Sequence, residues 1–359
     1  MSDMSIRQVG PKSAKTSIAF AIKMKRPTFL WGPPGIGKSD LVQQIGADTD
    51  REVIDVRLAL WEPTDIKGIP YFDSNAGTMT WAPPAELPTD PDSKAILFLD
   101  ELNSAPPAVQ AAAYQLILNR KVGTYVLPKG VDIVAAGNRD GDKGVTYRMP
   151  APLANRFVHL EMKVDFDDWQ DWATLHGINP EVVGYIGYAK QDLYDYDPKS
   201  PSKSFATPRS WSFVSDLVSD TEIDTESLTN LVSGAIGDGL AVKFMAHRKI
   251  ASKLPKPDDI LDGKVKDLEI KEVSAMYSLT VGLCYELKDR ADKKVSDWDK
   301  MADRFFEYMM KNFPTELVVM GAKTALTNYD LPLDASKMKS FDEFHKRFGK
   351  YVMNAMETD

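Results

Sequence analysis

The eight residues 32–39, Gly-Pro-Pro-Gly-Ile-Gly-Lys-Ser, constrain this chain more than any other stretch. They fit the pattern G-x-x-x-x-G-K-[ST], which predicts a loop whose backbone N–H groups surround the phosphates of a nucleotide. Glycine has no Cβ, so the backbone can curl tightly and approach the ligand closely. A β-prone run, 28–31, precedes the loop and a segment with helical spacing, 40–46, follows it, as the motif requires. A plain Gly/Pro surface turn before a helix is the alternative, and this context argues against it.

The residues of this loop are expected to bind ATP and Mg²⁺. Lys38 should reach the β- and γ-phosphates, and the Ser39 hydroxyl should ligate Mg²⁺. The helix that follows points its positive N-terminal end at the same ligand. The residues expected to contact the nucleotide are Gly32, Pro33, Pro34, Gly35, Ile36, Gly37, Lys38, Ser39 and Asp40.

Two later strands are predicted to end in polar side chains near this loop. The apolar run 95–99 is followed by Asp100 and Glu101, at the edge where parallel α/β sheets bind ligands. Asp100 is placed to organise Mg²⁺ and its water, and Glu101 to orient or deprotonate the water that attacks the γ-phosphate. The strand 131–137 ends in Asn138, which could bond the same water or phosphate. The alternatives are an acid pair that only ends a strand and an ordinary turn asparagine.

The composition is that of a soluble globular protein of 359 residues, with 43% hydrophobic and 27% charged residues. A net charge of −8 argues weakly against a protein that mainly coats nucleic acid, although a local basic channel stays possible in principle. The single cysteine, Cys284, excludes an internal disulfide and fits a reducing compartment. No apolar run approaches the ~20 residues of a membrane span, and no signal peptide is evident. We therefore expect a cytoplasmic protein without a membrane span.

Residues 61–90 interrupt the α/β pattern with two β-like pieces between prolines and glycines. They predict a hairpin inserted between a second strand, 53–58, and the buried strand. From residue 165 onward the β signal disappears and capped helices follow, with one helix expected over 227–250 and a loop over 253–264.

The predicted fold class is α/β: a P-loop NTPase αβα core with a parallel five-stranded sheet, followed by an all-helical lid and a helical C-terminal region. The expected domains are 1–164 (nucleotide-binding core with the hairpin insertion at about 61–90), 165–255 (helical lid) and 256–359 (helical C-terminal extension).

The order of these features resembles the AAA+ ATPases, and among them the MoxR-like branch, which has bacterial and phage members. The resemblance covers about 20–215 and is strongest at 148–157, Arg-Met-Pro-Ala-Pro-Leu-Ala-Asn-Arg-Phe, and at 207–211, Thr-Pro-Arg-Ser-Trp. It implies that Asn138 is the sensor-1 residue and that Arg209 is the sensor-2 residue of the lid. It also places 61–90 where this branch inserts a hairpin that faces the ring pore. The helices after residue 250 match no motif of the family.

The resemblance further implies that Arg156 is an arginine finger, which reaches the γ-phosphate bound to the neighbouring subunit. The chemistry agrees, because an arginine supplied in trans can add 10³–10⁵ to the rate of phosphoryl transfer. Arg148 is a rival for this role, and Arg156 could instead pair with a carboxylate such as Glu161. Arg209 could be a solvent-exposed helix residue. The residues expected to be catalytic are Lys38, Glu101, Asn138, Arg156 and Arg209.

The function implied is a Mg²⁺-dependent ATPase that forms a homo-oligomeric ring, a hexamer, and remodels or matures a protein partner. The family often works with proteins that carry a von Willebrand factor A domain. The main alternative is a nucleic-acid motor or translocase of the same superfamily. The acidic balance and the absence of Lys and Arg from 71–81 argue against nucleic acid as the partner, although a salt-sensitive basic pore would revive it. A non-catalytic nucleotide switch is disfavoured by the presence of Lys38, Asp100 and Glu101. A small-molecule kinase is disfavoured by Arg156, Arg209 and the helical lid.

Overall fold

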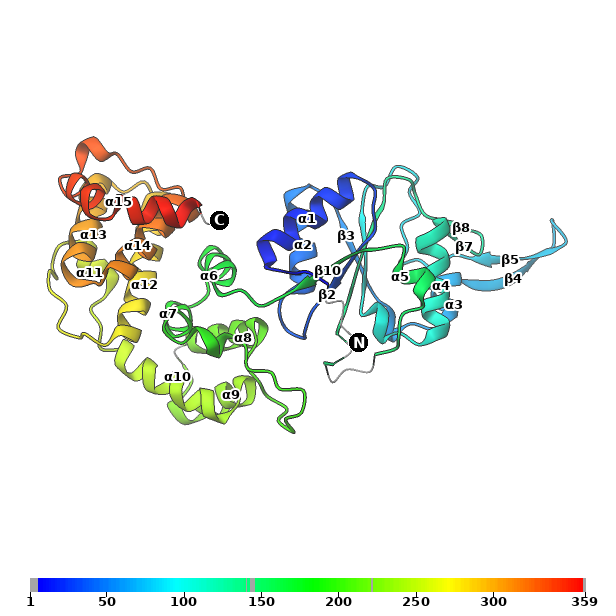
Figure 1. The fold of residues 1–359 in the computed structure, drawn as a ribbon, viewed down its shortest axis with the longest axis horizontal. Coiled ribbons are helices and arrows are strands. Elements are labelled where there is room, and N and C mark those ends of the chain that lie inside the picture. The colour runs from blue at the N-terminus through cyan, green and yellow to red at the C-terminus, as the bar shows by residue number, and fades with distance from the viewer. Residues whose placement is uncertain (1–5, 140, 143–145, 221, 358–359) are drawn as a thin grey trace. The chain divides into compact units, whose positions relative to one another are not determined.

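The computed structural model describes residues 6–139, 141–142, 146–220 and 222–357 (Figure 1). The chain divides into two compact units, which we describe separately. One consists of Met1–Asp165 and Asp197–Ser200, and the other of Phe166–Tyr196 and Pro201–Asp359. No helix in the described ranges is both long enough and apolar enough to cross a membrane.

A parallel six-stranded sheet forms the centre of the first unit. In spatial order its strands are β1 (Gln8–Val9), β10 (Val158–Met162), β2 (Thr28–Trp31), β9 (Asp132–Gly137), β6 (Ile96–Asp100) and β3 (Val53–Arg57). The five strands expected from the sequence are therefore present, and the α/β fold class is confirmed. The sixth strand, β1, pairs with β10 over two residues only, which is too short to leave a periodic pattern in the sequence.

Helices cover both faces of this sheet (Figure 1). On one face lie α1 (Pro11–Lys23) and α2 (Lys38–Asp48), and on the other α3 (Pro63–Lys67), α4 (Pro107–Asn119) and the short α5 (Ala151–Ala154). Alternate residues of a strand point to opposite faces, so Leu97 and Leu99 share a buried cluster with Val109 and Ala112 of α4. The double cover explains why β6 and β9 are buried along their whole length.

The predicted hairpin is formed by β4 (Ile69–Asp73) and β5 (Thr78–Ala82), which pair antiparallel and extend away from the sheet (Figure 1). A second, unpredicted hairpin, β7 (Lys121–Val122) with β8 (Tyr125–Val126), braces the base of the first. The Thr124 hydroxyl donates a hydrogen bond to the Trp81 carbonyl at 2.7 Å. A Cβ on Gly123 would lie 3.3 Å from the Trp81 ring, so the glycine admits this close packing.

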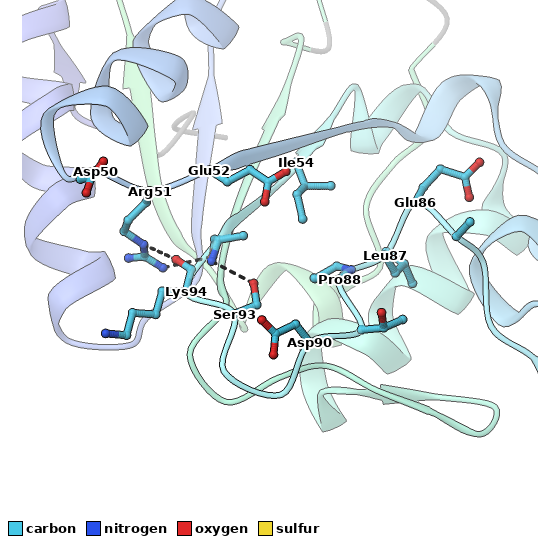
Figure 2. Close-up of a pocket in the computed structure, with 13 residues that line it drawn as sticks. Asp50, Arg51, Glu52, Ile54, Glu86, Leu87, Pro88, Asp90, Ser93 and Lys94 are labelled. Carbon is cyan, nitrogen blue, oxygen red and sulfur yellow. Dashed lines mark hydrogen bonds between the residues drawn. The ribbon is translucent and has the colours of Figure 1, made fainter.

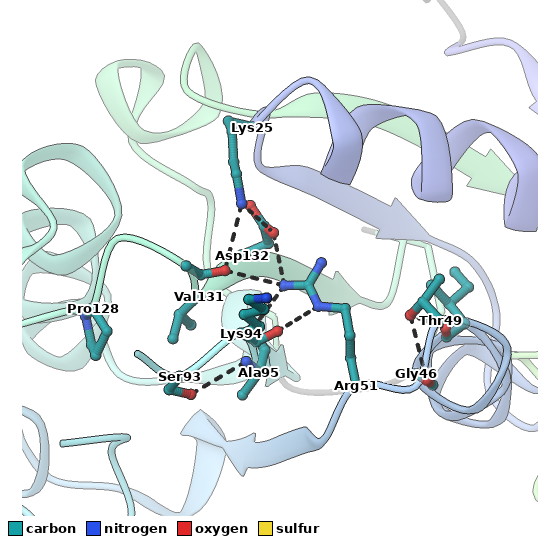
Figure 3. A network of polar contacts seen from close by, with 12 residues as sticks. Lys25, Gly46, Thr49, Arg51, Ser93, Lys94, Ala95, Pro128, Val131 and Asp132 are labelled. Carbon is teal, nitrogen blue, oxygen red and sulfur yellow. Dashed lines mark hydrogen bonds and ion pairs between the residues drawn. The ribbon is translucent and has the colours of Figure 1, made fainter. Parts of the chain in front are cut away.

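A polar network fastens the amino ends of neighbouring strands (Figure 3). The Asp132 carboxylate, 4% exposed, accepts hydrogen bonds from Arg51 at 2.8 Å and from Lys25 at 2.9 Å. Arg51 also donates to the backbone oxygens of Lys94, Ala95 and Gly130. These residues stand just before or at the start of β2, β3, β6 and β9, so one cluster of charges holds four strand ends together.

Helices and connecting turns make up the described part of the second unit. They are α6 (Phe166–Leu175), α7 (Pro180–Tyr188), α8 (Pro208–Ser219), α9 (Thr225–Ile236), α10 (Asp238–Ala251), α11 (Pro257–Leu261), α12 (Val273–Asp292), α13 (Trp298–Asn312), α14 (Thr315–Lys323) and α15 (Phe341–Glu357). The single helix expected over 227–250 is wrong. The chain breaks at Gly237, whose φ of 90° lies in the region that favours glycine. The loop expected over 253–264 contains α11.

Helices α7 and α12 pack unusually closely within this unit. A Cβ on Gly184 would lie 2.1 Å from the Ser278 hydroxyl oxygen, and one on Gly187 would lie 2.7 Å from the Tyr277 ring. The hydroxyl of Tyr285, also on α12, donates to the Ile178 carbonyl at 2.7 Å. Residues expected in the lid and residues expected in the C-terminal extension thus share one packed core.

Candidate functional site

The phosphate loop joins β2 to α2 with the glycines that its conformation requires. Gly35 and Gly37 have φ values of 75° and 91°, which side chains with a Cβ rarely adopt. A Cβ on Gly32 would lie 2.6 Å from Ile36 Cδ1 and 3.0 Å from the Met162 carbonyl oxygen. The loop therefore curls over the N-terminus of α2, where the N–H groups of the first turn are free to meet an anion.

The expected nucleotide-contacting residues all lie on this loop and the first turn of α2. Pro33 and Ile36 are buried beneath the loop, whereas Asp40 is exposed. The Lys38 ammonium donates hydrogen bonds to the carbonyl oxygens of Gly32 at 2.7 Å and Pro33 at 3.0 Å. The ammonium is thus held over the concave side of the loop.

Lys38 also meets Asn138, which follows β9. Its Nζ donates to Asn138 Oδ1 at 3.1 Å, although the two residues are 100 positions apart in the chain. The strands β2 and β9 are direct neighbours, with Trp31 paired to Gly137. Their carboxyl ends consequently bring the predicted lysine and the predicted sensor asparagine together.

Ser39 and Asp100 form the candidate magnesium site. The Ser39 hydroxyl donates to Asp100 Oδ2 at 2.8 Å, and Asp100 Oδ1 accepts the N–H of Glu101 at 2.8 Å. A hydroxyl and a carboxylate oxygen in contact are hard donors that suit Mg²⁺, which commonly keeps several waters and takes further ligands from phosphate. In the described ranges no three His, Cys, Asp or Glu residues cluster to hold a metal.

Glu101 stands at the carboxyl end of β6 with its side chain exposed. Its backbone has a φ of 54°, a left-handed conformation that costs a non-glycine residue free energy and is common where function demands a particular orientation. Sequence reasoning missed Asp55 of β3, which lies opposite Phe98 of β6, two residues before Asp100. Burial and the negative charge of Asp100 raise the pKa of the Asp55 carboxyl, against the lowering effect of Arg57.

Arg156 and Arg148 are both exposed in the first unit. Within the ranges that the structure describes, neither guanidinium makes a hydrogen bond or ion pair. The alternative pairing of Arg156 with Glu161 does not occur. Glu161 instead accepts a hydrogen bond from Gln8 Nε2 at 2.8 Å and lies 3.5 Å from Arg139 Nη1.

Arg209 is the second residue of α8, in the second unit, and its side chain is exposed. Thr207 caps this helix, since its hydroxyl accepts the N–H of Ser210 at 3.1 Å. Threonine followed by proline is a typical helix start, and Thr207 and Pro208 follow this pattern.

Sequence reasoning also missed Asn103, which is 1% exposed. Its side-chain amide bonds both backbone groups of Asn138. The only signal in the sequence is its position two residues after Glu101.

An open pocket of about 560 Å³ lies at the amino edge of the sheet, beside β3 (Figure 2). Six of its thirteen lining residues are charged, namely Asp50, Arg51, Glu52, Glu86, Asp90 and Lys94. None of the residues predicted to contact nucleotide lines it, because the phosphate loop follows the opposite ends of the strands. The pocket is therefore distinct from the nucleotide site.

Comparison with known proteins agrees with this geometry. Residues 27–157 match the AAA domain of the dynein-related subfamily. Midasin of Giardia intestinalis is 27% identical over 192 residues, which is 51% of this chain but only 4% of midasin. The chain thus spans a small fraction of that curated relative.

Solved structures resemble the chain more distantly. A RuvB mutant of Thermotoga maritima has a TM-score of 0.38 and 17% identity, with 84% of this chain and 88% of that chain covered. NtrX of Brucella abortus has a TM-score of 0.40 and 14% identity, with coverages of 85% and 69%. Residues 27–157 thus match an AAA domain, and the sheet order and the phosphate loop agree with that match.

Proposed function

We propose that this chain is a Mg²⁺-dependent ATPase that forms a homo-oligomeric ring, a hexamer, and remodels a protein partner. One observation carries the proposal: Lys38, Asn138, Ser39 and Asp100 converge at one sheet edge, while Arg156 stays exposed. The convergent residues supply the groups that bind a nucleotide and its metal. The exposed arginine is available to a neighbouring subunit.

Each residue has a distinct role in this proposal. Lys38 turns from the loop carbonyls to the β- and γ-phosphates, and Asn138 orients the γ-phosphate or the attacking water. Glu101 accepts the proton of that water as it attacks. Ser39 and Asp100 would hold Mg²⁺, which would neutralise charge on the phosphates. Arg156 of a neighbouring copy adds the remaining positive charge, and Arg209 reports the bound nucleotide to the helical second unit.

The exposed hairpin β4–β5 favours a protein, and not a nucleic acid, as the binding partner. Phe72 is 70% exposed and Met79 is 67% exposed, and the two pair directly across the strands. The residues 69–82 contain no Lys or Arg, so the hairpin offers apolar contact area and no charge for phosphates. We infer a MoxR-like chaperone activity on this basis, with a von Willebrand factor A domain protein as the candidate partner. The buried thiol of Cys284 fits a reducing compartment, which we take to be the cytoplasm.

The substitution Glu101→Gln tests the ATPase part of the proposal. The variant should bind ATP with wild-type affinity, since the amide keeps the shape of the side chain, and should hydrolyse it at least about 100-fold more slowly because general base catalysis is lost. Binding is measured with a fluorescent ATP analogue and turnover by phosphate release. Wild-type turnover would mean that another group activates the water.

The same variant tests the partner. With ATP it should form rings, measured by native mass spectrometry, and retain a protein from nuclease-treated lysate. Phe72→Ser with Met79→Ser should abolish retention and keep basal ATPase activity, whereas Val126→Ser, 62% exposed on the neighbouring hairpin, should retain the protein. Retention that depends on nucleic acid would instead favour a nucleic-acid motor.

A further inference from the structure

We propose that Asn103 is a positioning residue that holds the sensor asparagine, Asn138, in register with the acid pair Asp100 and Glu101. The inference rests on the proposed function, because it assumes that Asn138 acts on the γ-phosphate or the attacking water. Asn103 touches neither group itself. Its role is to fix where Asn138 stands relative to the two carboxylates.

The side-chain amide of Asn103 makes two hydrogen bonds to the backbone of Asn138. Asn103 Nδ2 donates to the Asn138 carbonyl at 2.7 Å, and Asn103 Oδ1 accepts the Asn138 N–H at 3.2 Å. A side-chain amide thus pairs with the N–H and C=O of one residue, as a neighbouring strand would. Only one orientation of the amide satisfies both bonds.

The Asn138 backbone needs these side-chain partners because the neighbouring strand β6 ends before it. The pairing of β6 with β9 ends at Leu99 and Ala135, three residues before Asn138. The chain leaves β6 at Glu101 and enters a helical turn, Leu102–Ser104, so no β6 backbone remains beside Asn138. Without Asn103 the backbone N–H and carbonyl of the half-buried Asn138 would lack these partners on the β6 side, and an unpaired backbone polar group away from water destabilises the fold.

Gly137 supplies the space that this amide occupies. A Cβ at this position would lie 2.1 Å from Asn103 Oδ1 and 2.8 Å from Phe29 Cζ. The backbone of Gly137 is regular strand, so the glycine is required here by the approach of Asn103. The absence of a side chain at Gly137 therefore allows the Asn103 amide to reach the end of β9.

Asn103 also holds a third segment. Its backbone carbonyl accepts the N–H of Tyr147 at 2.7 Å, and Tyr147 precedes Arg148 on the segment that leads to α5 and Arg156. One residue thus connects the acid pair, the sensor and the arginine-bearing segment.

The main test compares Asn103→Ala, Asn138→Ala and the double variant. Asn103→Ala should lower kcat about 10-fold or more and change the ATP dissociation constant less than about threefold. The ratio of the dissociation constants for ADP and a non-hydrolysable ATP analogue should fall towards that of Asn138→Ala. The double variant should be no slower than Asn138→Ala, because Asn103 acts through Asn138. Multiplied effects in the double variant, or a normal kcat in Asn103→Ala, would overturn the proposal.

The outcomes separate this proposal from the proposed function. If Asn138→Ala lowers kcat and Asn103→Ala does not, only the positioning role fails. If Asn138→Ala leaves kcat and the nucleotide preference unchanged, the sensor role fails and the positioning role fails with it. Gln110→Leu is the matched control, because Gln110 is an equally buried amide that donates to the Ala105 carbonyl. It should lower thermal stability and leave kcat unchanged.

A second pair of variants keeps the test valid if Asn103→Ala folds poorly. Gly137→Ala drives a methyl group into the Asn103 amide and should lower both stability and kcat. Adding Asn103→Ala removes the clashing amide, so the pair should be more stable than Gly137→Ala alone and remain slow. Recovery of kcat together with stability would show that Asn103 serves folding only.

Discussion

Replacing Asp132 by alanine removes the carboxylate that two cations share at the amino edge of the sheet. Arg51 is the closer and better buried of the two, with a side chain 15% exposed, whereas Lys25 is 59% exposed. A hydrogen bond to a charged group contributes about 1.5–3 kcal/mol, and an exposed ion pair at most about 1 kcal/mol. The Arg51 bond therefore dominates the loss.

The loss of stability on removing the Asp132 carboxylate is limited because Arg51 has other hydrogen-bond partners. It keeps its hydrogen bonds to three backbone oxygens, so the loss should lie at the lower end of the 3–5 kcal/mol measured for broken buried pairs. We expect the free energy of unfolding of the first unit to fall by about 3 kcal/mol. For a unit of this size, that lowers Tm by about 6–12 °C.

Calorimetry of the full chain measures this shift, with Lys25→Ala as the control that should lose at most about 1 kcal/mol. ATP affinity at 20 °C should stay unchanged, because the network lies at the opposite strand ends from Lys38. A loss in Asp132→Ala no larger than in Lys25→Ala would refute the assignment of the main bond to Arg51. A large loss of ATP affinity would refute the separation of the two edges.

Other parts of the molecule yield further predictions. Lys38→Ala should weaken ATP binding about 10–100-fold in calorimetric titration, because a charged hydrogen bond to phosphate is lost; unchanged affinity would remove the phosphate-loop assignment. Mixing Arg156→Ala with Glu101→Gln subunits should restore some ATPase activity if the arginine acts in trans, and no rescue at any ratio would contradict a shared site. Burial lowers the pKa of His247 to about 4, so the unfolded chain, with a pKa near 6.5, takes up the proton first. Stability should therefore be full above pH 6.5 and fall by up to about 3 kcal/mol towards pH 4, and urea unfolding of His247→Gln should lack this component; equal pH dependence in both proteins would contradict it. Gly184→Val should destabilise the second unit by more than about 2 kcal/mol in the same assay, because its side chain would enter the backbone of Ser278, and a neutral effect would refute the tight α7–α12 contact.

The sequence was informative where one local pattern or one general rule of topology decides the structure. The glycines of the phosphate loop act through their own backbone conformations, so residues 32–39 were sufficient to predict the curl. The meeting of Lys38, Asp100 and Asn138 follows from a rule about parallel sheets, whose carboxyl ends share one edge. Neither inference needed the positions of other side chains.

The second unit was harder to predict, because helical periodicity does not register single breaks. Residues 234–239 read Gly-Ala-Ile-Gly-Asp-Gly, and each glycine inside a helix costs only about 1 kcal/mol. The prediction of one helix over 227–250 passed over these glycines and the Asp-Gly turn signal among them. The break depends on Gly237 adopting a φ of 90°, which the packing of the two helices selects.

Asn103 shows why the rest of the site could not be foreseen. In the sequence it is a polar residue before Ser-Ala-Pro-Pro, a context that suggests a helix start and nothing more. Its significance arises because β6 stops pairing at Leu99 while β9 continues to Gly137, which leaves backbone groups that only a short amide can reach. The lengths of two strands, the absence of a side chain at Gly137 and the turn after Glu101 must all be known before that amide has a partner. Asn103 and Asn138 are 35 positions apart, so a sequence motif that contains one does not point to the other. Asn103 is recognised only when the structure shows which backbone groups of Asn138 lack a strand partner.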